Sequence, residues 1–191
     1  MGVGSIIFWA VVIGFFFYFV MIYNNLVTLK NNVSQAWSNI DILLKQRHDE
    51  LPKLVETCRQ YMGYEKDVLE KVTQARAAVH SARESGNMAA LGQAESQLRT
   101  GLGSLFAVAE NYPELRANEN FQHLQARISQ LEAQIADRRE FYNDTVNVNN
   151  IRVEQFPDGI VARLFNFGSR QLLHFDASQT SDVNIKSLFS N

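Results

Sequence analysis

Four histidines are the side chains of this sequence with the clearest capacity for chemistry, because imidazole binds metals and moves protons near neutral pH. They are His48, His80, His123 and His174. Helical bundles that hold di-metal carboxylate sites use Glu-x-x-His pairs on facing helices, and the sequence contains no such pair. The nearest approach, Glu119 with His123, stands alone at a predicted helix start. We therefore expect structural or solvated histidines, no metal site and no cofactor.

Two further candidates for chemistry lie on one predicted helix. Residues 47–50 read Arg-His-Asp-Glu next to Pro52. They are interpreted as a polar network at a helix kink, with an acid–base cluster as the alternative. Cys58 is the only cysteine, so disulfide frameworks and cysteine-based metal sites are excluded. It lies on the apolar side of the helix, which favours a small buried hydrophobe over a reactive thiol.

Composition and motifs give no support for an enzyme or a nucleic-acid binder. The sequence has no Gly-rich phosphate loop, no G-x-S-x-G turn and no HExxH pair. The net charge of −2 and the absence of a basic cluster with interleaved aromatics argue against nucleic acid as a partner. We expect a non-catalytic protein, with a metal-dependent enzyme as the least favoured alternative.

The first 29 residues contain no charged side chain. The stretch SIIFWAVVIGFFFYFVMIY is long enough to cross a hydrocarbon layer of ~30 Å. A cleaved signal peptide would need a basic start and a small-x-small cleavage site, and neither occurs before Asn24. We therefore predict an uncleaved transmembrane anchor at residues 1–25. Its transmembrane residues include Ile6, Phe8, Trp9, Phe15, Phe16, Phe17 and Phe19.

The next segment predicts a long amphipathic helix that continues the anchor. Its apolar positions repeat in steps of three and four, with one skip at Arg47, which is a heptad seam. They are Leu26, Leu29, Val33, Ala36, Ile40, Leu43, Leu51, Leu54, Cys58 and Tyr61. Pro52 predicts a kink or break around His48–Leu51.

Three more helices follow, at about 65–84, 88–111 and 120–155, with a turn at Ser85-Gly86-Asn87 and a connection NYPELRAN. Short links make each helix antiparallel to the last. The fold class predicted is all-α: a transmembrane helix continuing into an elongated antiparallel four-helix bundle or coiled coil, with two long and two short helices, over residues 26–156.

The two short helices can cover only part of the long pair, so a two-helix stalk is predicted next to the membrane, with its seam left open. The residues expected to mediate association there are Leu26, Leu29, Val33, Trp37, Ile40, Phe141, Tyr142 and Val146. A register in which facing residue numbers sum to about 179 pairs Asp41 with Arg138, Arg47 with Glu132, and Trp37 with Tyr142. Nine asparagines in the stalk are interpreted as a solvated face, or as hydrogen-bonding groups that set register or oligomer state.

The fourth helix returns the chain toward the membrane, so residues 157–175 are predicted to be an apolar membrane-proximal segment, with a possible strand at 171–175. This segment is expected to pack on the stalk, lie in the lipid interface or dock a neighbouring subunit. Its apolar residues are Phe156, Ile160, Val161, Leu164, Phe165 and Phe167. Residues 176–191 are polar and predict a flexible tail.

The sequence resembles the bacterial LemA family. The resemblance lies in residues 23–56, VTQAR at 72–76, YPELRANENFQHLQ at 112–125, RREFYND at 138–144 and the Phe-Pro at 156–157. It implies a helical bundle on a single N-terminal span, with most of the protein in the cytoplasm and no established enzymatic activity. Similar proteins occur in magnetosome membranes, and family genes often neighbour genes of membrane proteases.

The function expected is a membrane-anchored scaffold that self-associates through the stalk and organises membrane or partner proteins. The alternative is an adaptor or regulator of a membrane protease. The expected partners are the lipid bilayer, further copies of the chain and other membrane proteins. Lys30 and the unpaired Cys58 favour a single-pass protein with its N-terminus outside and its main domain in the cytoplasm. The resemblance to a bacterial family implies that the membrane is the bacterial inner membrane.

Overall fold

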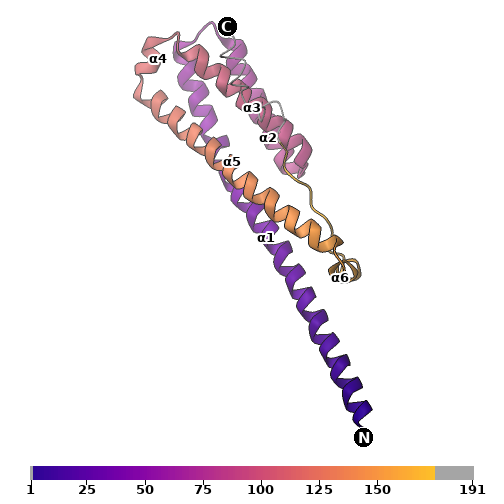
Figure 1. The fold of residues 1–191 in the computed structure, drawn as a ribbon. Helices are drawn as coiled ribbons and strands as arrows, with labels where there is room; N and C mark the ends of the chain where they lie inside the picture. Colours follow the sequence, from indigo (N-terminus) through magenta and orange to yellow (C-terminus); the bar gives the residue numbers. More distant parts are fainter. Residues whose placement is uncertain (1, 175–191) are drawn as a thin grey trace, which may run out of the picture. The chain divides into compact units, whose positions relative to one another are not determined.

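The computed structural model describes residues 2–174, and all regular structure in this range is helical (Figure 1). The predicted all-α fold is confirmed. The chain divides into two compact units. The stalk unit comprises Met1–Lys45 and Leu131–Leu172, and the bundle unit comprises Gln46–Gln130 and the chain from Leu173 onward. The predicted flexible tail at 176–191 lies outside the described residues.

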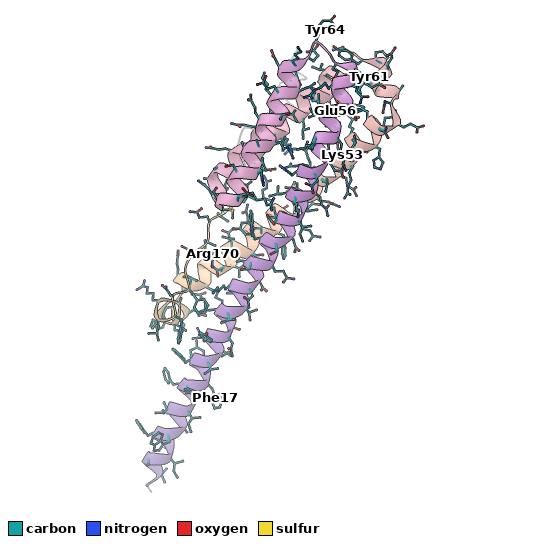
Figure 2. All side chains as sticks on the ribbon, turned by 180° about the vertical axis from the view of Figure 1, so that it is seen from behind. Phe17, Lys53, Glu56, Tyr61, Tyr64 and Arg170 are labelled. Carbon is teal, nitrogen blue, oxygen red and sulfur yellow. The ribbon has the colours of Figure 1, made fainter. Side chains whose placement is uncertain are left out.

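Helix α1 spans Val3–Tyr61 without interruption and therefore joins the predicted anchor to the amphipathic segment (Figure 1). Its N-terminal part carries an apolar window with mean hydropathy 2.5 that is only 6% buried, so it is long and apolar enough to cross a membrane. Phe17, for example, is 67% exposed and projects from a stretch of α1 that no other helix covers (Figure 2). So much uncovered apolar surface is not typical of a protein surface in water.

The predicted break at His48–Leu51 is wrong, because α1 continues through Pro52. Pro52 lies on the exposed side of the helix and has no N–H to donate to the His48 carbonyl four residues earlier. The Arg76 side chain donates to that carbonyl through Nε at 3.0 Å instead. The skip in the heptad pattern at Arg47 is explained by a shift in the buried positions and not by a helix break. Leu44 rather than Leu43 is fully buried, and Arg47 itself is a buried member of the seam, with 2% exposed surface. The seam thus shifts by one four-residue step, as in a coiled-coil stutter.

In the bundle unit, α2 (Lys66–Ser85) and α3 (Met88–Ala109) form a hairpin. The predicted turn is confirmed: Gly86 adopts a φ of +66°, and its N–H and that of Asn87 close the end of α2 on Arg83 and Ala82. This left-handed conformation favours glycine. The Asn87 side chain accepts a hydrogen bond from the Ala90 N–H at 3.0 Å and so caps α3.

The predicted connection NYPELRAN contains a short helix, α4 (Pro113–Ala117). Asn118 follows it and caps α5 (Glu119–Glu154), because its Oδ1 accepts from the Phe121 N–H at 3.1 Å. Its amide also donates to the Tyr61 hydroxyl at 3.0 Å. Asn118 therefore fixes the start of α5 to the end of α1 within the bundle unit.

The apolar piece after α5 forms a helix, α6 (Asp158–Leu164), reached through a turn that contains a cis Phe156–Pro157 peptide bond. The strand considered at 171–175 is not formed at residues 171–174, which have no regular structure, and Phe175 lies outside the described residues. The backbone of residues 168–171 is instead bonded to side chains of α5.

Candidate functional site

Helix α6 packs against α1 where the apolar stretch of α1 ends. Ile22 and Leu26 of α1 form a buried cluster with Val161 and Ala162 of α6. Ala162 is fully buried, so its methyl group is what allows the two helices to approach closely. The contact fixes α6 to the part of the chain that leaves the predicted span.

Aromatic rings surround this cluster. The Phe165 ring centroid lies 4.8 Å from that of Tyr23 and 6.0 Å from that of Phe19, and Phe167 lies 5.8 Å from Tyr23. These separations fall in the favourable range for edge-to-face and tilted pairs. The rings of Phe165 and Phe167, which follow α6, therefore pack against two successive turns of α1.

Gly159 lets α6 fold back on the end of α5. A Cβ atom at this position would lie 3.0 Å from the Val153 carbonyl oxygen and 3.3 Å from that of Glu154. Both obstacles are backbone atoms, which cannot move aside as a flexible side chain would. Arg152 of α5 donates to the buried carboxylate of Asp158, the first residue of α6, at 3.5 Å. This bond also holds α6 against the end of α5.

Gly159→Ala is expected to lower the free energy of unfolding of the stalk unit by ~1–3 kcal/mol, as overpacking against fixed atoms does. Gly103→Ala is the matched control, because Gly103 lies in α3 with nothing within 4 Å of an added Cβ. It should stabilise the protein by up to ~1 kcal/mol through helix propensity. Thermal unfolding followed by circular dichroism measures both, and equal effects of the two substitutions would contradict the close approach at Gly159.

Side chains of α5 hold the segment after α6. The Tyr142 hydroxyl donates to the Gln171 carbonyl at 3.0 Å, and burial raises the pKa of this phenol. Asn150 makes two hydrogen bonds with the Arg170 backbone, at 2.9 and 2.8 Å, and Asn149 donates to the Gly168 carbonyl at 3.4 Å. These two asparagines thus bind the backbone of the segment after α6. The hydrogen bonds considered for them in the sequence were instead between helices.

The predicted contact between Trp37 and Tyr142 is confirmed, with ring centroids 5.9 Å apart. The pairs Asp41–Arg138 and Arg47–Glu132 stay predictions. The prediction that the apolar seam of the stalk is left open, however, is wrong. Its main side chains are less than 6% exposed within a single chain, namely Leu26, Val33, Ile40, Tyr142 and Val146. Leu29 and Trp37 are half-buried.

Phe141 differs from the other residues predicted for the stalk because it is 55% exposed. Val148 and Ile151, on the same side of α5, are 49% and 62% exposed. Spacings of seven and three residues keep these side chains within one face of the helix. A groove runs beside them. It is lined by Leu29, Asn32, Gln35, Ala36 and Asn39 of α1 and by Arg138, Phe141, Asp144, Thr145 and Val148 of α5.

The bundle unit contains a buried ion pair that is not among the predicted pairs. Arg47 of α1 bonds to Glu95 of α3, and both side chains are 3% exposed. The available signal was the position of Glu95 between Leu91 and Leu98, at core spacing on an otherwise apolar face. A carboxylate at such a position requires a buried partner.

His48 belongs to a second polar group in this unit. Arg76 donates through Nε to the His48 carbonyl at 3.0 Å, and its Nη2 lies 2.7 Å from His48 Nε2. The His80 ring lies beside that of His48 in a tilted arrangement, with centroids 4.8 Å apart. Burial, followed by the positive charge of Arg76, lowers the pKa of His48 below 6.5. His48 therefore belongs to a polar network, as predicted for residues 47–50. In its neutral form, the His48 imidazole accepts a hydrogen bond from Arg76.

Lowering the pH should destabilise the bundle unit through His48. The folded-state pKa is lower than the value of 6.5 for a free side chain, so the unfolded chain binds the proton first. Stability is then fully present above pH 6.5 and falls as the pH drops toward the folded-state pKa. His48→Gln should flatten this part of a plot of unfolding free energy against pH, whereas an unchanged slope would exclude His48 as its source.

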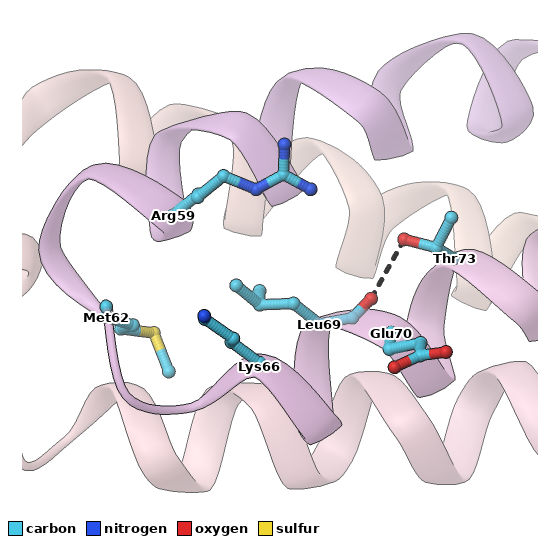
Figure 3. A pocket seen from close by; sticks show the side chains of 7 residues that line it. Arg59, Met62, Lys66, Leu69, Glu70 and Thr73 are labelled. Carbon is cyan, nitrogen blue, oxygen red and sulfur yellow. Dashed lines mark hydrogen bonds between the residues drawn. The ribbon is translucent and has the colours of Figure 1, made fainter.

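Within residues 2–174, no three His, Cys, Asp or Glu side chains gather closely enough to hold a metal ion. A shallow pocket lies at the turn between α1 and α2, lined by Arg59, Met62, Gly63, Lys66, Leu69, Glu70 and Thr73 (Figure 3). The Thr73 hydroxyl donates to the Leu69 carbonyl at 2.8 Å and is thus bonded within α2.

These features define a membrane-associated, all-helical protein with one apolar helix that continues into its folded part. The sequence pattern of the LemA family matches residues 36–186, and the chain belongs to this family. Magnetosome protein MamQ 2 of Paramagnetospirillum magneticum is 24% identical, over 91% of this chain and 72% of its own length. Protein LemA of Metamycoplasma hominis is 26% identical, over 94% of this chain and 81% of its own length.

Proposed function

We propose that the protein is a non-catalytic, membrane-anchored scaffold whose copies associate side by side through the stalk unit and organise membrane or partner proteins. One observation carries the proposal: Phe141, Val148 and Ile151 form an exposed apolar row on α5 outside the core. Such a row is costly in water unless another surface covers it.

Anchoring by α1 favours this association. Copies held in one bilayer share their orientation, so much of the rotational freedom that association normally costs is already lost. The groove beside Phe141 carries Arg138 and Asp144 as well as apolar side chains, and mixed lining of this kind is typical of interfaces formed after folding. Relatives named as magnetosome proteins support a role at a membrane.

The test is the mass of the full chain in mild detergent, measured by size-exclusion chromatography with light scattering. The wild type is expected above the 21.7 kDa of one chain. The double variant Phe141→Ser with Val148→Ser should shift toward a single chain. Tyr64→Ser is the matched control, since Tyr64 is 97% exposed but belongs to the bundle unit. A monomeric wild type, or a double variant with unchanged mass, would overturn the proposal.

The same proposal places the protein in the bacterial inner membrane, with the N-terminus outside and the main domain in the cytoplasm. The buried, unpaired Cys58 supports this orientation because free thiols are usual in reducing compartments. A C-terminal fusion should therefore fluoresce when the partner is green fluorescent protein and stay inactive when it is alkaline phosphatase. The opposite pair of results would reverse the orientation.

A further inference from the structure

Helix α6 has two apolar faces, and residues 2–174 cover only one of them. Val161 and Ala162 are buried on α1, but Ile160 and Leu164 are 61% and 69% exposed. Four residues apart, these two side chains lie on the same side of the helix. Phe156, in the preceding turn, is 79% exposed and lines the same shallow hollow as Ile160 and Leu164. The uncovered face is therefore continuous.

The contacts of α6 place this face at a defined depth relative to the predicted span. Asn24 and Asn25 are the first amides after the apolar stretch, and Lys30 is its first charge. At ~1.5 Å per residue, Phe19 lies about 7 Å inside a boundary at Asn24. The Phe165 ring centroid lies 4.8 Å from that of Tyr23 and 6.0 Å from that of Phe19, and Val161 and Ala162 contact Ile22 and Leu26 on either side of this boundary. Helix α6 is thus held at the boundary, and its C-terminal end faces the region between headgroups and acyl chains where amphipathic helices lie.

We propose that α6 and its preceding turn bind the lipid surface beside α1 and insert Phe156, Ile160 and Leu164 between headgroups and acyl chains. The charges nearby agree with a headgroup environment: Arg163 and Arg170 are exposed, and Arg152 is half-exposed and bonded to Asp158. Glu154 is the one exposed carboxylate on the same turns. The inference requires α1 to be in the membrane but does not depend on self-association.

A lipid contact at α6 would give the anchor a second function. A single helix in a bilayer is free to tilt and to rotate about its axis. Helix α6 is packed on Ile22 and Leu26 and, in this proposal, is also inserted in the lipid beside them. Any tilt or rotation of α1 would therefore move the exposed apolar face of α6 away from its preferred depth in the bilayer. The folded part would consequently leave the membrane in one preferred direction, which side-by-side association requires.

The test uses an environment-sensitive fluorophore on the full chain in nanodiscs of phosphatidylcholine with phosphatidylglycerol. Ile160→Cys and, separately, Leu164→Cys provide the labelling sites. The native Cys58 can stay, because it is fully buried and burial raises its pKa to about 12, so it remains an unreactive thiol. Ser38→Cys is the matched control: it is exposed on α1 within the stalk unit, about 20 Å along the helix from Asn24.

Labels at positions 160 and 164 are expected to emit at shorter wavelength and severalfold more strongly than the label at 38. Lipids with a spin label near the headgroup should quench them more than lipids labelled at the chain end. Emission as in water at both positions would overturn the proposal. So would emission that is shifted but not quenched by either lipid, since another protein surface would then cover α6.

Discussion

Replacing Glu95 by Leu is expected to destabilise the bundle unit by about 3–5 kcal/mol, the typical cost of removing one member of a buried ion pair. The substitution removes the Glu95 carboxylate from the buried Arg47 guanidinium, which is 3% exposed. Denaturant unfolding can be followed by reaction of Cys58, which is fully buried in the folded chain.

The double variant Glu95→Leu with Arg47→Met separates charge from packing. Apolar side chains of similar volume can replace a buried ion pair at little cost, so at least half of the lost stability should return. Lys53→Met is the control, because the Lys53–Glu50 pair is at the surface and should contribute less than ~1 kcal/mol. If the double variant were as unstable as Glu95→Leu alone, the loss would not come from the broken Arg47–Glu95 ion pair.

Ile40→Ala should cost about 2–5 kcal/mol, the usual range for a large-to-small change in a core. Ile40 is fully buried within one chain, although it lies in the segment where the sequence predicts an open seam. The cavity left by the missing methyl groups therefore forms inside the protomer. Thermal unfolding in detergent measures the loss.

Ile42→Ala provides the matched comparison, since the same side chain two residues later is 56% exposed. Its effect should stay within about ±0.5 kcal/mol. A loss from Ile40→Ala that grew or vanished with protein concentration would instead mean that the buried seam belongs to an interface between chains. Concentration series of both variants distinguish these cases.

Periodicity predicts the helices well because each long helix has a strong apolar repeat and a local end signal. Gly86, Asn87 and Asn118 each bond to backbone groups within a few residues, so their roles can be inferred from short stretches of sequence. The contact between Trp37 and Tyr142 could also be predicted, because placing residues 61 and 118 at the same level determines the register of the two antiparallel helices.

The candidate site was less predictable because it depends on groups far apart in sequence. Helix length alone suggested that the stalk seam lacks cover, but Asn150 and Tyr142 hold the returning chain near it through backbone atoms. Backbone acceptors have no sequence signature. Likewise, Pro52 signals a break, yet tertiary packing on the opposite side of α1 maintains the helix.

The mass distribution of the wild-type chain in lipid nanodiscs, measured by native mass spectrometry, tests the scaffold account most directly. If the chains associate side by side, species at multiples of 21.7 kDa should persist at the lowest protein-to-lipid ratio and decrease in the Phe141→Ser, Val148→Ser variant. A single species of 21.7 kDa at every ratio would contradict it.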